Sequence, residues 1–193
     1  MNMNVPLLMG AYVGIEPLAG SHEAELKAAA DDPTLWPYMF RDGSGEGFAE
    51  WWREAVDAHD AGNEVVFVVR EQESGRVVGS TRYINIAPAH LRLEIGHTWY
   101  ERAAWGSNVN PECKLLLMTH AFEALGYNRV ELRCDSRNAR SWEAIKRLGA
   151  IEEGILRRHM VVQNGYVRDT VQFSVLLEEW PRVQKGLEAR VKE

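Results

Sequence analysis

Residues 91–135, LRLEIGHTWYERAAWGSNVNPECKLLLMTHAFEALGYNRVELRCD, decide the fold of this chain. Apolar and polar residues alternate over 91–100 and again over 128–135, which predicts two strands. Between them, 111–125 carries an apolar stripe at helical spacing and is closed by Gly126, so it predicts a helix. A strand, a helix and a second strand require a crossover. We therefore expect these two strands to lie parallel.

The start of this helix suits a phosphate group. Asn110 is a good N-cap residue and Pro111 suits the first helical position. Gly106 would let the backbone of the preceding turn approach a ligand closely, and unpaired N–H groups at a helix start attract phosphate. A simple capped helix has the same features. The pattern therefore supports two interpretations, a cup of backbone amides for a phosphate or an ordinary helix start.

The rest of the chain predicts strands and helices on both sides of this unit. The Asn164-Gly165 pair favours a type I′ hairpin turn, and Ser21 suits a helix cap. We expect strands over 11–16, 63–71, 76–86, 150–162 and 166–176, and helices over 21–32, 48–61, 138–149 and 178–191. This order predicts an α+β fold, a single domain over residues 1–193. Its sheet is mixed and mostly antiparallel, with one parallel strand pair and flanking helices.

Composition bounds the class of protein. The chain has 193 residues, of which 46% are hydrophobic, enough for one domain with a core. No apolar run approaches the roughly 18 residues of a membrane helix, and the first residues lack the basic region of a signal peptide. A net charge of −6 argues against a nucleic-acid binder. We expect a cytoplasmic protein without membrane or nucleic-acid partners.

The cysteines and histidines indicate no metal site. Cys113 and Cys134 form no CxxC pair, so we expect two buried free thiols. The six histidines show no metal-ligand spacing. We therefore expect no bound metal.

Charge is unevenly spread along the chain. Residues 1–128 hold 9 Lys and Arg against 18 Asp and Glu, whereas residues 129–193 hold 13 against 10. An acidic first part and a basic last part would suit a cationic substrate on one side and an anionic cofactor on the other. Ordinary surface charge explains the asymmetry equally well.

The run from Glu94 to Met160 resembles the GNAT superfamily of acyl-CoA-dependent N-acetyltransferases. More narrowly, it resembles the branch that contains the ribosomal-protein N-terminal acetyltransferases. The similarity is strong over about 90–178, and the element order matches that fold throughout. It implies acetyl-CoA as acyl donor and a primary amine as acceptor. It also implies a cofactor-binding core over about 90–178 and an acceptor-side wall over about 1–62.

The resemblance implies where acetyl-CoA binds. In this family one strand bulges and splays from its parallel neighbour, opening a V for the pantetheine arm, and Gly96 favours such a bulge here. The following turn, usually Gln/Arg-x-x-Gly-x-Gly/Ala, binds the pyrophosphate and maps to 103–108. Gly106 matches, whereas Ala103 and Asn108 depart from the pattern. The implied cofactor-binding residues are Trp99, Tyr100, Gly106, Ser107, Asn108, Val109, Asn110, Asn138 and Ser141.

A base must take a proton from the amine. Glu94 alternates away from Leu93 and Ile95, so it should face the opposite side of the sheet, beside the expected bulge. It resembles the glutamate that many family members carry there, and it would accept the ammonium proton through water. An exposed cross-strand partner for an arginine is the plainer interpretation. His97, with an ordinary pKa near 6.5, is an alternative base.

An acid must protonate the departing thiolate. Asn138-Ala139-Arg140-Ser141 matches the family's Asn-x-x-Ser pattern, which implies that Asn138 binds the pantetheine and that Ser141 lies near the sulfur. Helix capping would also select Asn and Ser. Many members carry a tyrosine four residues after that serine as the acid, but this chain has Ile145. Ser141, or a water molecule, is then the expected proton donor.

Three functions compete. The first is an N-acetyltransferase in which a protein N-terminus or a small cationic amine attacks acetyl-CoA directly in a ternary complex. The second is a non-catalytic acyl-CoA- or peptide-binding protein of the same fold, which the missing tyrosine supports. The third is transfer of another acyl group such as succinyl, which needs a basic or roomy pocket beside the thioester. Because many relatives pair, a homodimer is also possible.

Overall fold

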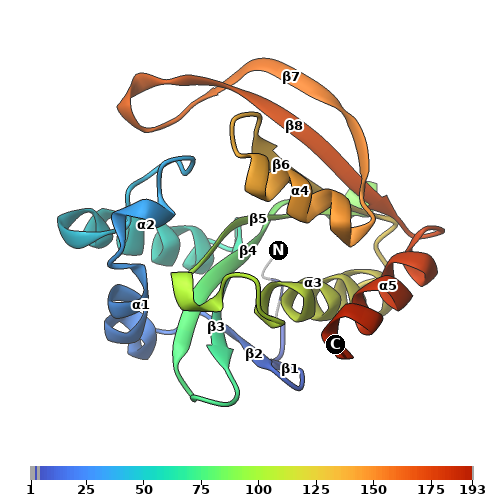
Figure 1. The fold of residues 1–193 in the computed structure, drawn as a ribbon, viewed down its shortest axis with the longest axis horizontal. Helices are drawn as coiled ribbons and strands as arrows, with labels where there is room; N and C mark the ends of the chain where they lie inside the picture. Colours follow the sequence, from blue (N-terminus) through green and yellow to red (C-terminus); the bar gives the residue numbers. More distant parts are fainter. Residues whose placement is uncertain (1–2, 4, 193) are drawn as a thin grey trace.

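The structure, a computed structural model, describes residue 3 and residues 5–192. Figure 1 shows one sheet with helices on both faces. Its strands are β1 (Leu8–Met9), β2 (Val13–Pro17), β3 (Val65–Glu71), β4 (Val77–Ala87), β5 (Arg92–Tyr100), β6 (Arg129–Asp135), β7 (Ile151–Val161) and β8 (Val167–Leu176). Its α-helices are α1 (Glu23–Ala30), α2 (Phe48–Asp60), α3 (Val109–Thr119), α4 (Ala139–Leu148) and α5 (Trp180–Lys192).

The sheet has the order β1-β2-β3-β4-β5-β6-β8-β7. Strands β5 and β6 are parallel, and every other neighbouring pair is antiparallel. The parallel pair is short, because it runs only from Arg92↔Arg129 to Glu94↔Glu131. Strand β6 continues against β8 as far as Asp135, so β5 and β6 separate beyond Glu94. The α+β fold with a splayed parallel pair is confirmed, and β1 is an added strand.

A bulge in β5 accompanies the separation. Ser80 pairs with Trp99 but Arg82 pairs with Gly96, so β5 carries one extra residue between them. His97 lies in this bulge with a left-handed φ of 49°. A Cβ on Gly96 would lie 2.7 Å from Ile84 Cδ1, so the Ile84 side chain would have to move to accommodate a larger residue. The bulge expected at Gly96 is therefore present, centred one residue later.

The core has two apolar layers, one on each face of the sheet. Strand β3 divides between them, since Phe67 packs with α3 and α5 while Val66 and Val68 pack with α1 and α2. Figure 1 shows these two pairs of helices on opposite sides of the sheet. Both cysteines are buried and free, as expected. Both faces of the central strands are thus covered.

Two residues predicted to cap helices, Asn110 and Ser21, are not the caps. Helix α3 begins at Val109, because Val109 packs in the core at 2% exposure and Glu112 N–H donates to Asn108 O (3.0 Å). Asn110 is therefore inside the first turn and is not the cap. Ser21 lies in a 3₁₀ turn, Gly20–His22, and α1 begins after it.

The hairpin turn between β7 and β8 matches its expectation. Asn164 and Gly165 both have positive φ, 61° and 71°, as a type I′ turn requires.

One carboxylate joins α3 to the start of β2. Glu112 is 4% exposed, and its oxygens accept the backbone N–H groups of Ala11 (2.8 Å), Tyr12 (2.7 Å) and Val13 (2.7 Å). A Cβ on Gly10 would lie 2.3 Å from the Glu112 carboxyl carbon, so only glycine fits there. The amino end of α3 is thereby fixed against the sheet.

Over the described residues, no helix has the length and apolar character to cross a membrane.

Candidate functional site

A cavity of about 400 Å³ lies where β5 and β6 separate. Its walls come from β5 (residues 94–100), β6 (132–135), the turn before α3, α3 itself and α4. The N-terminal part closes it with Leu35, Tyr38, Met39 and Phe40. The predicted site residues on its wall are Glu94, Trp99, Tyr100, Gly106, Ser107, Asn110, Asn138 and Ser141. The splayed strands therefore produce a cleft at the position that the sequence indicates.

The amino end of α3 faces one end of this cleft. Gly106 has a φ of 77° and open space at its Cα, so the turn needs a glycine there. Ser107 Oγ donates to Ala104 O (2.8 Å) and accepts the Val109 N–H (3.2 Å), which holds the turn. The positive end of the helix dipole thus points at a backbone turn, the arrangement that binds phosphate groups.

Cations surround the same end. The Arg140 guanidinium lies 3.4 Å from the Trp105 ring centroid and, with Arg147 and Arg190, lines the cleft. Lys146, next to Arg147 in α4, is absent from the cleft wall and pairs with Glu143 (2.8 Å). Three arginines are therefore available to an anionic ligand here.

Two predicted cofactor-binding residues lie behind the turn. Asn108 Nδ2 donates to Val191 O (3.3 Å), and the Val109 side chain belongs to the core. Neither side chain is on the cleft wall. Trp99 and Tyr100 are also buried, at 4% and 8% exposure. Asn108 and Val109 are therefore not part of the cleft wall, whereas Trp99 and Tyr100 are buried residues that line it.

Asn138 and Ser141 lie together at the start of α4. Asn138 Oδ1 accepts the Ser141 N–H (3.0 Å), so Asn138 is the helix cap that its residue type favours. Both residues also line the cleft, across from β5. Capping therefore places the Ser141 hydroxyl beside the cavity, and the structural and functional interpretations are compatible.

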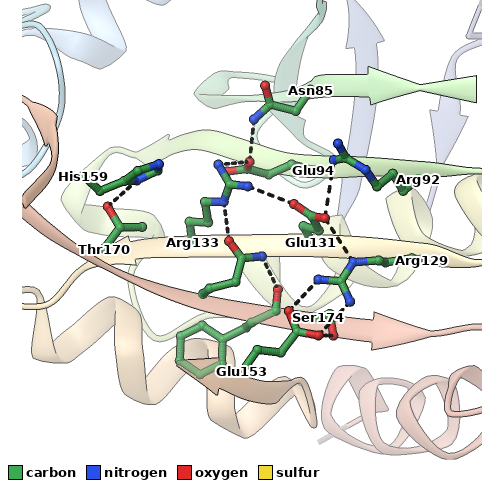
Figure 2. Close-up of polar contacts among 12 residues, drawn as sticks. Asn85, Arg92, Glu94, Arg129, Glu131, Arg133, Glu153, His159, Thr170 and Ser174 are labelled. Atoms are coloured by element: carbon green, nitrogen blue, oxygen red, sulfur yellow. Dashed lines mark hydrogen bonds and ion pairs between the residues drawn. The ribbon is translucent and has the colours of Figure 1, made fainter. Parts of the chain in front are cut away.

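Glu94 lies at the point where β5 and β6 divide. It is 4% exposed, and its Oε2 accepts from Asn85 Nδ2 (2.8 Å) and lies 3.3 Å from Arg133 Nη1 (Figure 2). Burial raises the pKa of Glu94 above its ordinary value, with the nearby Glu131 charge adding to this, while Arg133 and Asn85 act in the opposite direction. A buried carboxylate with a raised pKa in a cleft is suited to accepting a proton.

A polar network fixes this carboxylate. Arg133 also pairs with Glu131 (3.0 Å) and donates to Gln172, and Glu131 accepts from Arg129 (3.0 Å). Figure 2 shows Glu94 of β5 beside Arg133, Glu131 and Arg129 of β6. Because several contacts hold each member, Glu94 has one well-defined position.

His97 is less suited to be the base. Its ring packs 5.4 Å from the Phe40 ring, and burial, aided by the charges of Arg82 and Arg168, lowers its pKa to about 3. An imidazole with so low a pKa holds a proton weakly at neutral pH. The geometry therefore favours Glu94 over His97.

The structure adds two cations that sequence reasoning missed. Lys114 is 5% exposed, and its Nζ donates to Thr98 Oγ1 (3.0 Å) in the bulge. Burial lowers the Lys114 pKa to about 8. Arg168 of β8 is 7% exposed. Both line the cleft. Lys114 could have been noticed in the sequence as a lysine one turn into an apolar helix. Arg168 could not, because an arginine in a hairpin strand is not unusual.

Among the residues that the structure describes, no three His, Cys, Asp or Glu side chains are grouped to hold a metal ion.

Known proteins with similar sequences are acetyltransferases or resemble them. Residues 13–151 match the family model described as "Acetyltransferase (GNAT) domain". The chain is 28% identical over 131 residues to the Bacillus subtilis protein named "Putative ribosomal N-acetyltransferase YdaF", covering 68% of this chain and 67% of that protein.

Solved structures agree. A GCN5-related N-acetyltransferase from Brucella melitensis superposes with a TM-score of 0.88 at 33% identity, covering 96% of this chain and 85% of that one. Mycobacterium smegmatis RimJ, solved in complex with CoA-disulfide, has the same fold, with a TM-score of 0.77 at 23% identity over 92% of this chain and 88% of that one. The chain therefore belongs to the GNAT family of acetyltransferases.

Proposed function

We propose that this protein transfers the acetyl group of acetyl-CoA to a primary amine by direct attack in a ternary complex. The observation that carries the proposal is the cleft between β5 and β6, which has a helix amino end with three arginines at one end and the buried Glu94 in its wall. The core over about 90–178 would hold the donor, and the N-terminal part over about 1–62 would form the acceptor-side wall.

The donor fits the cleft by its chemistry. The turn at Gly106, Ser107 and Asn110 would hold the pyrophosphate, with Arg140 and Arg147 neutralising its charge. The pantetheine arm would then lie in the gap between β5 and β6, where the two facing strand edges no longer pair with each other. The thioester would be placed beside the bulge, within reach of Glu94.

The reaction joins the amine nitrogen to the thioester carbon. Glu94 takes one N–H proton, directly or through water, so that the nitrogen lone pair attacks the carbonyl carbon. The nitrogen of the resulting tetrahedral adduct still carries one proton too many. As the carbon–sulfur bond breaks, this second proton passes through Ser141 Oγ or through water to the CoA thiolate, so the serine hydroxyl is restored. An acetamide and free CoA result. Neither buried cysteine suits a covalent intermediate, because burial raises the pKa of Cys113 to about 12 and of Cys134 to about 11.

Ser141→Ala tests the proton donor. We expect kcat to fall about 10²-fold, because the variant loses the hydroxyl but keeps the backbone N–H that Asn138 caps. The Kd for acetyl-CoA should stay nearly unchanged. Steady-state rates with calorimetric titration measure both. A wild-type rate would assign the proton to water instead.

The test of the function itself is calorimetric titration with acetyl-CoA, with CoA alongside, followed by a screen of amines for CoA release. Saturable one-to-one binding and turnover support the proposal. Binding without turnover of any amine would favour a non-catalytic acyl-CoA-binding protein. No binding by the folded protein would overturn the proposal.

A further inference from the structure

Arg168 is a buried cation without a counter-ion. Among the described residues, no Asp or Glu oxygen lies within 4.0 Å of its guanidinium. Its Nε donates to Thr170 Oγ1 (2.9 Å), its Nη2 lies 3.8 Å from Met160 Sδ, and its Cζ lies 4.9 Å from the Phe40 ring centroid. A guanidinium that is more than nine-tenths buried ordinarily has a carboxylate partner. Arg168 instead lies on the cleft wall with donor capacity to spare.

The neighbouring arginines do not share this property. Arg133 is occupied by Glu94 (3.3 Å), Glu131 (3.0 Å) and Gln172. Arg137 pairs with Asp135 (2.7 Å). Arg168 is thus distinguished from them, because their charges are already compensated within the protein.

The cleft as a whole is cationic. Its basic lining residues are Lys114, Arg133, Arg140, Arg147, Arg168 and Arg190, and its acidic ones are Glu94 and Asp135. From the acidic first part, residues 1–128, Glu94 is the acidic residue on the wall, and residues 1–62 contribute Leu35, Tyr38, Met39 and Phe40, none of them acidic. A purely cationic acceptor, which the charge asymmetry of the sequence suggests, therefore finds little support here.

Arg168 belongs to the reacting end of the cleft. Its charge is close enough to Glu94, His97 and Asp135 to shift the pKa of each. A planar guanidinium recognises a carboxylate through two parallel hydrogen bonds. A carboxylate bound there would lie beside the atoms that react, away from the phosphate end.

We propose that Arg168 binds a carboxylate carried by one of the two reacting partners, an inference that rests on the proposed acyltransferase function. Two sources share this chemistry. One is the α-carboxylate of an amino acid whose amine is acylated near Glu94. The other is the distal carboxylate of a dicarboxylic acyl donor such as succinyl-CoA.

The experiment compares Arg168→Met and Arg168→Lys with the control Arg157→Met, which removes an exposed arginine from the neighbouring strand β7. One arm titrates succinyl-CoA and acetyl-CoA into each protein. The other measures acetyl transfer to L-amino acids and to their carboxamides. Thermal unfolding and acetyl-CoA affinity verify that each variant is folded.

The expected result is selective. Arg168→Met should lose about 30-fold in succinyl-CoA affinity with acetyl-CoA affinity kept, or about 30-fold in kcat/KM for amino acids with carboxamides unaffected. The first outcome assigns the carboxylate to the donor and the second to the acceptor. Arg168→Lys should lose less than Arg168→Met, because lysine keeps the positive charge but cannot form the two parallel hydrogen bonds of a guanidinium.

Two results separate the inference from the proposed function. If the wild type binds acetyl-CoA but neither arm distinguishes Arg168→Met from Arg157→Met, the carboxylate site is wrong and the acyltransferase proposal stands. If the folded wild type binds neither acyl-CoA, the proposed function is wrong, and the carboxylate site falls with it.

Discussion

Glu94→Gln is expected to slow acetyl transfer by about 10²- to 10⁴-fold, the range that a positioned general base contributes. Glutamine keeps the size of the side chain and can still accept from Asn85 through its amide oxygen, but it cannot take the amine proton. Because the acyl-CoA contacts proposed here do not involve Glu94, the Kd for acetyl-CoA should remain nearly the same. Single-turnover rates with acetyl-CoA and a saturating amine measure the effect.

The pH dependence of kcat/KM tests the role of Glu94 as the base independently. Glu94 must be ionised to act as base, and burial raises its pKa above the ordinary 4.5. The wild-type kcat/KM should therefore rise with pH through a value above 4.5, and Glu94→Gln should lose this acid limb. The raised pKa also means that the folded state binds this proton more tightly than the unfolded chain does. Ionising Glu94 therefore lowers the free energy of unfolding of the wild type as pH rises above 4.5. Because glutamine does not ionise, Glu94→Gln should be at least as stable as the wild type at pH 7.

Glu131→Gln is the matched control. Glu131 is buried in the same network and also pairs with Arg133, but it is not on the cleft wall. Its loss should disturb the network while leaving a base in the cleft. Equal slowing in the two variants would show that the network, and not the Glu94 carboxylate, supports the rate. A wild-type rate in Glu94→Gln would remove the base assignment.

The sequence predicts the part of the fold that local pattern controls. Alternation over 91–100 and 128–135, with a helix between them, predicts two neighbouring strands joined by a helical crossover and therefore parallel. The pairing of β5 with β6 confirms this prediction. Gly96 indicates the bulge because a glycine inside a strand often marks one, and β5 has its extra residue directly after Gly96. The start of α3 is predicted two residues late, since a cap residue and a proline favour a site that Val109 packing overrides.

The candidate site is less predictable where distant strands meet. Glu94 can be placed beside the bulge by counting along one strand, but its burial depends on Arg133 of β6 and Asn85 of β4. No sequence pattern near Arg168 predicts a site residue, because its position depends on β8 packing beside Phe40, which is distant in the sequence. The charge asymmetry of the sequence does not say which charged residues face the cleft, although the basic last part supplies five of its arginines, Arg133, Arg140, Arg147, Arg168 and Arg190.

Glu112→Ala is expected to lower the free energy of unfolding by about 3–5 kcal/mol, because three backbone N–H groups lose a charged acceptor worth roughly 1.5–3 kcal/mol each. The full sum is not reached, since Ala11 and Tyr12 are exposed and water can replace the carboxylate there. Val13 is fully buried, so its N–H remains unpaired. Urea denaturation followed by circular dichroism measures the difference.

Two further variants determine whether the loss of stability in Glu112→Ala comes from its three hydrogen bonds to β2 or from removing any glutamate from a helix. Glu112→Gln should fall between the wild type and Glu112→Ala, because the amide oxygen accepts while its NH₂ opposes a backbone donor. Glu188→Ala, on the exposed face of α5, removes the same charge and should change stability by less than about 0.5 kcal/mol. If Glu112→Ala matched Glu188→Ala, the three hydrogen bonds would contribute nothing net. The amino end of α3, and the turn at Gly106 beside it, would then be held by core packing around Val109 alone.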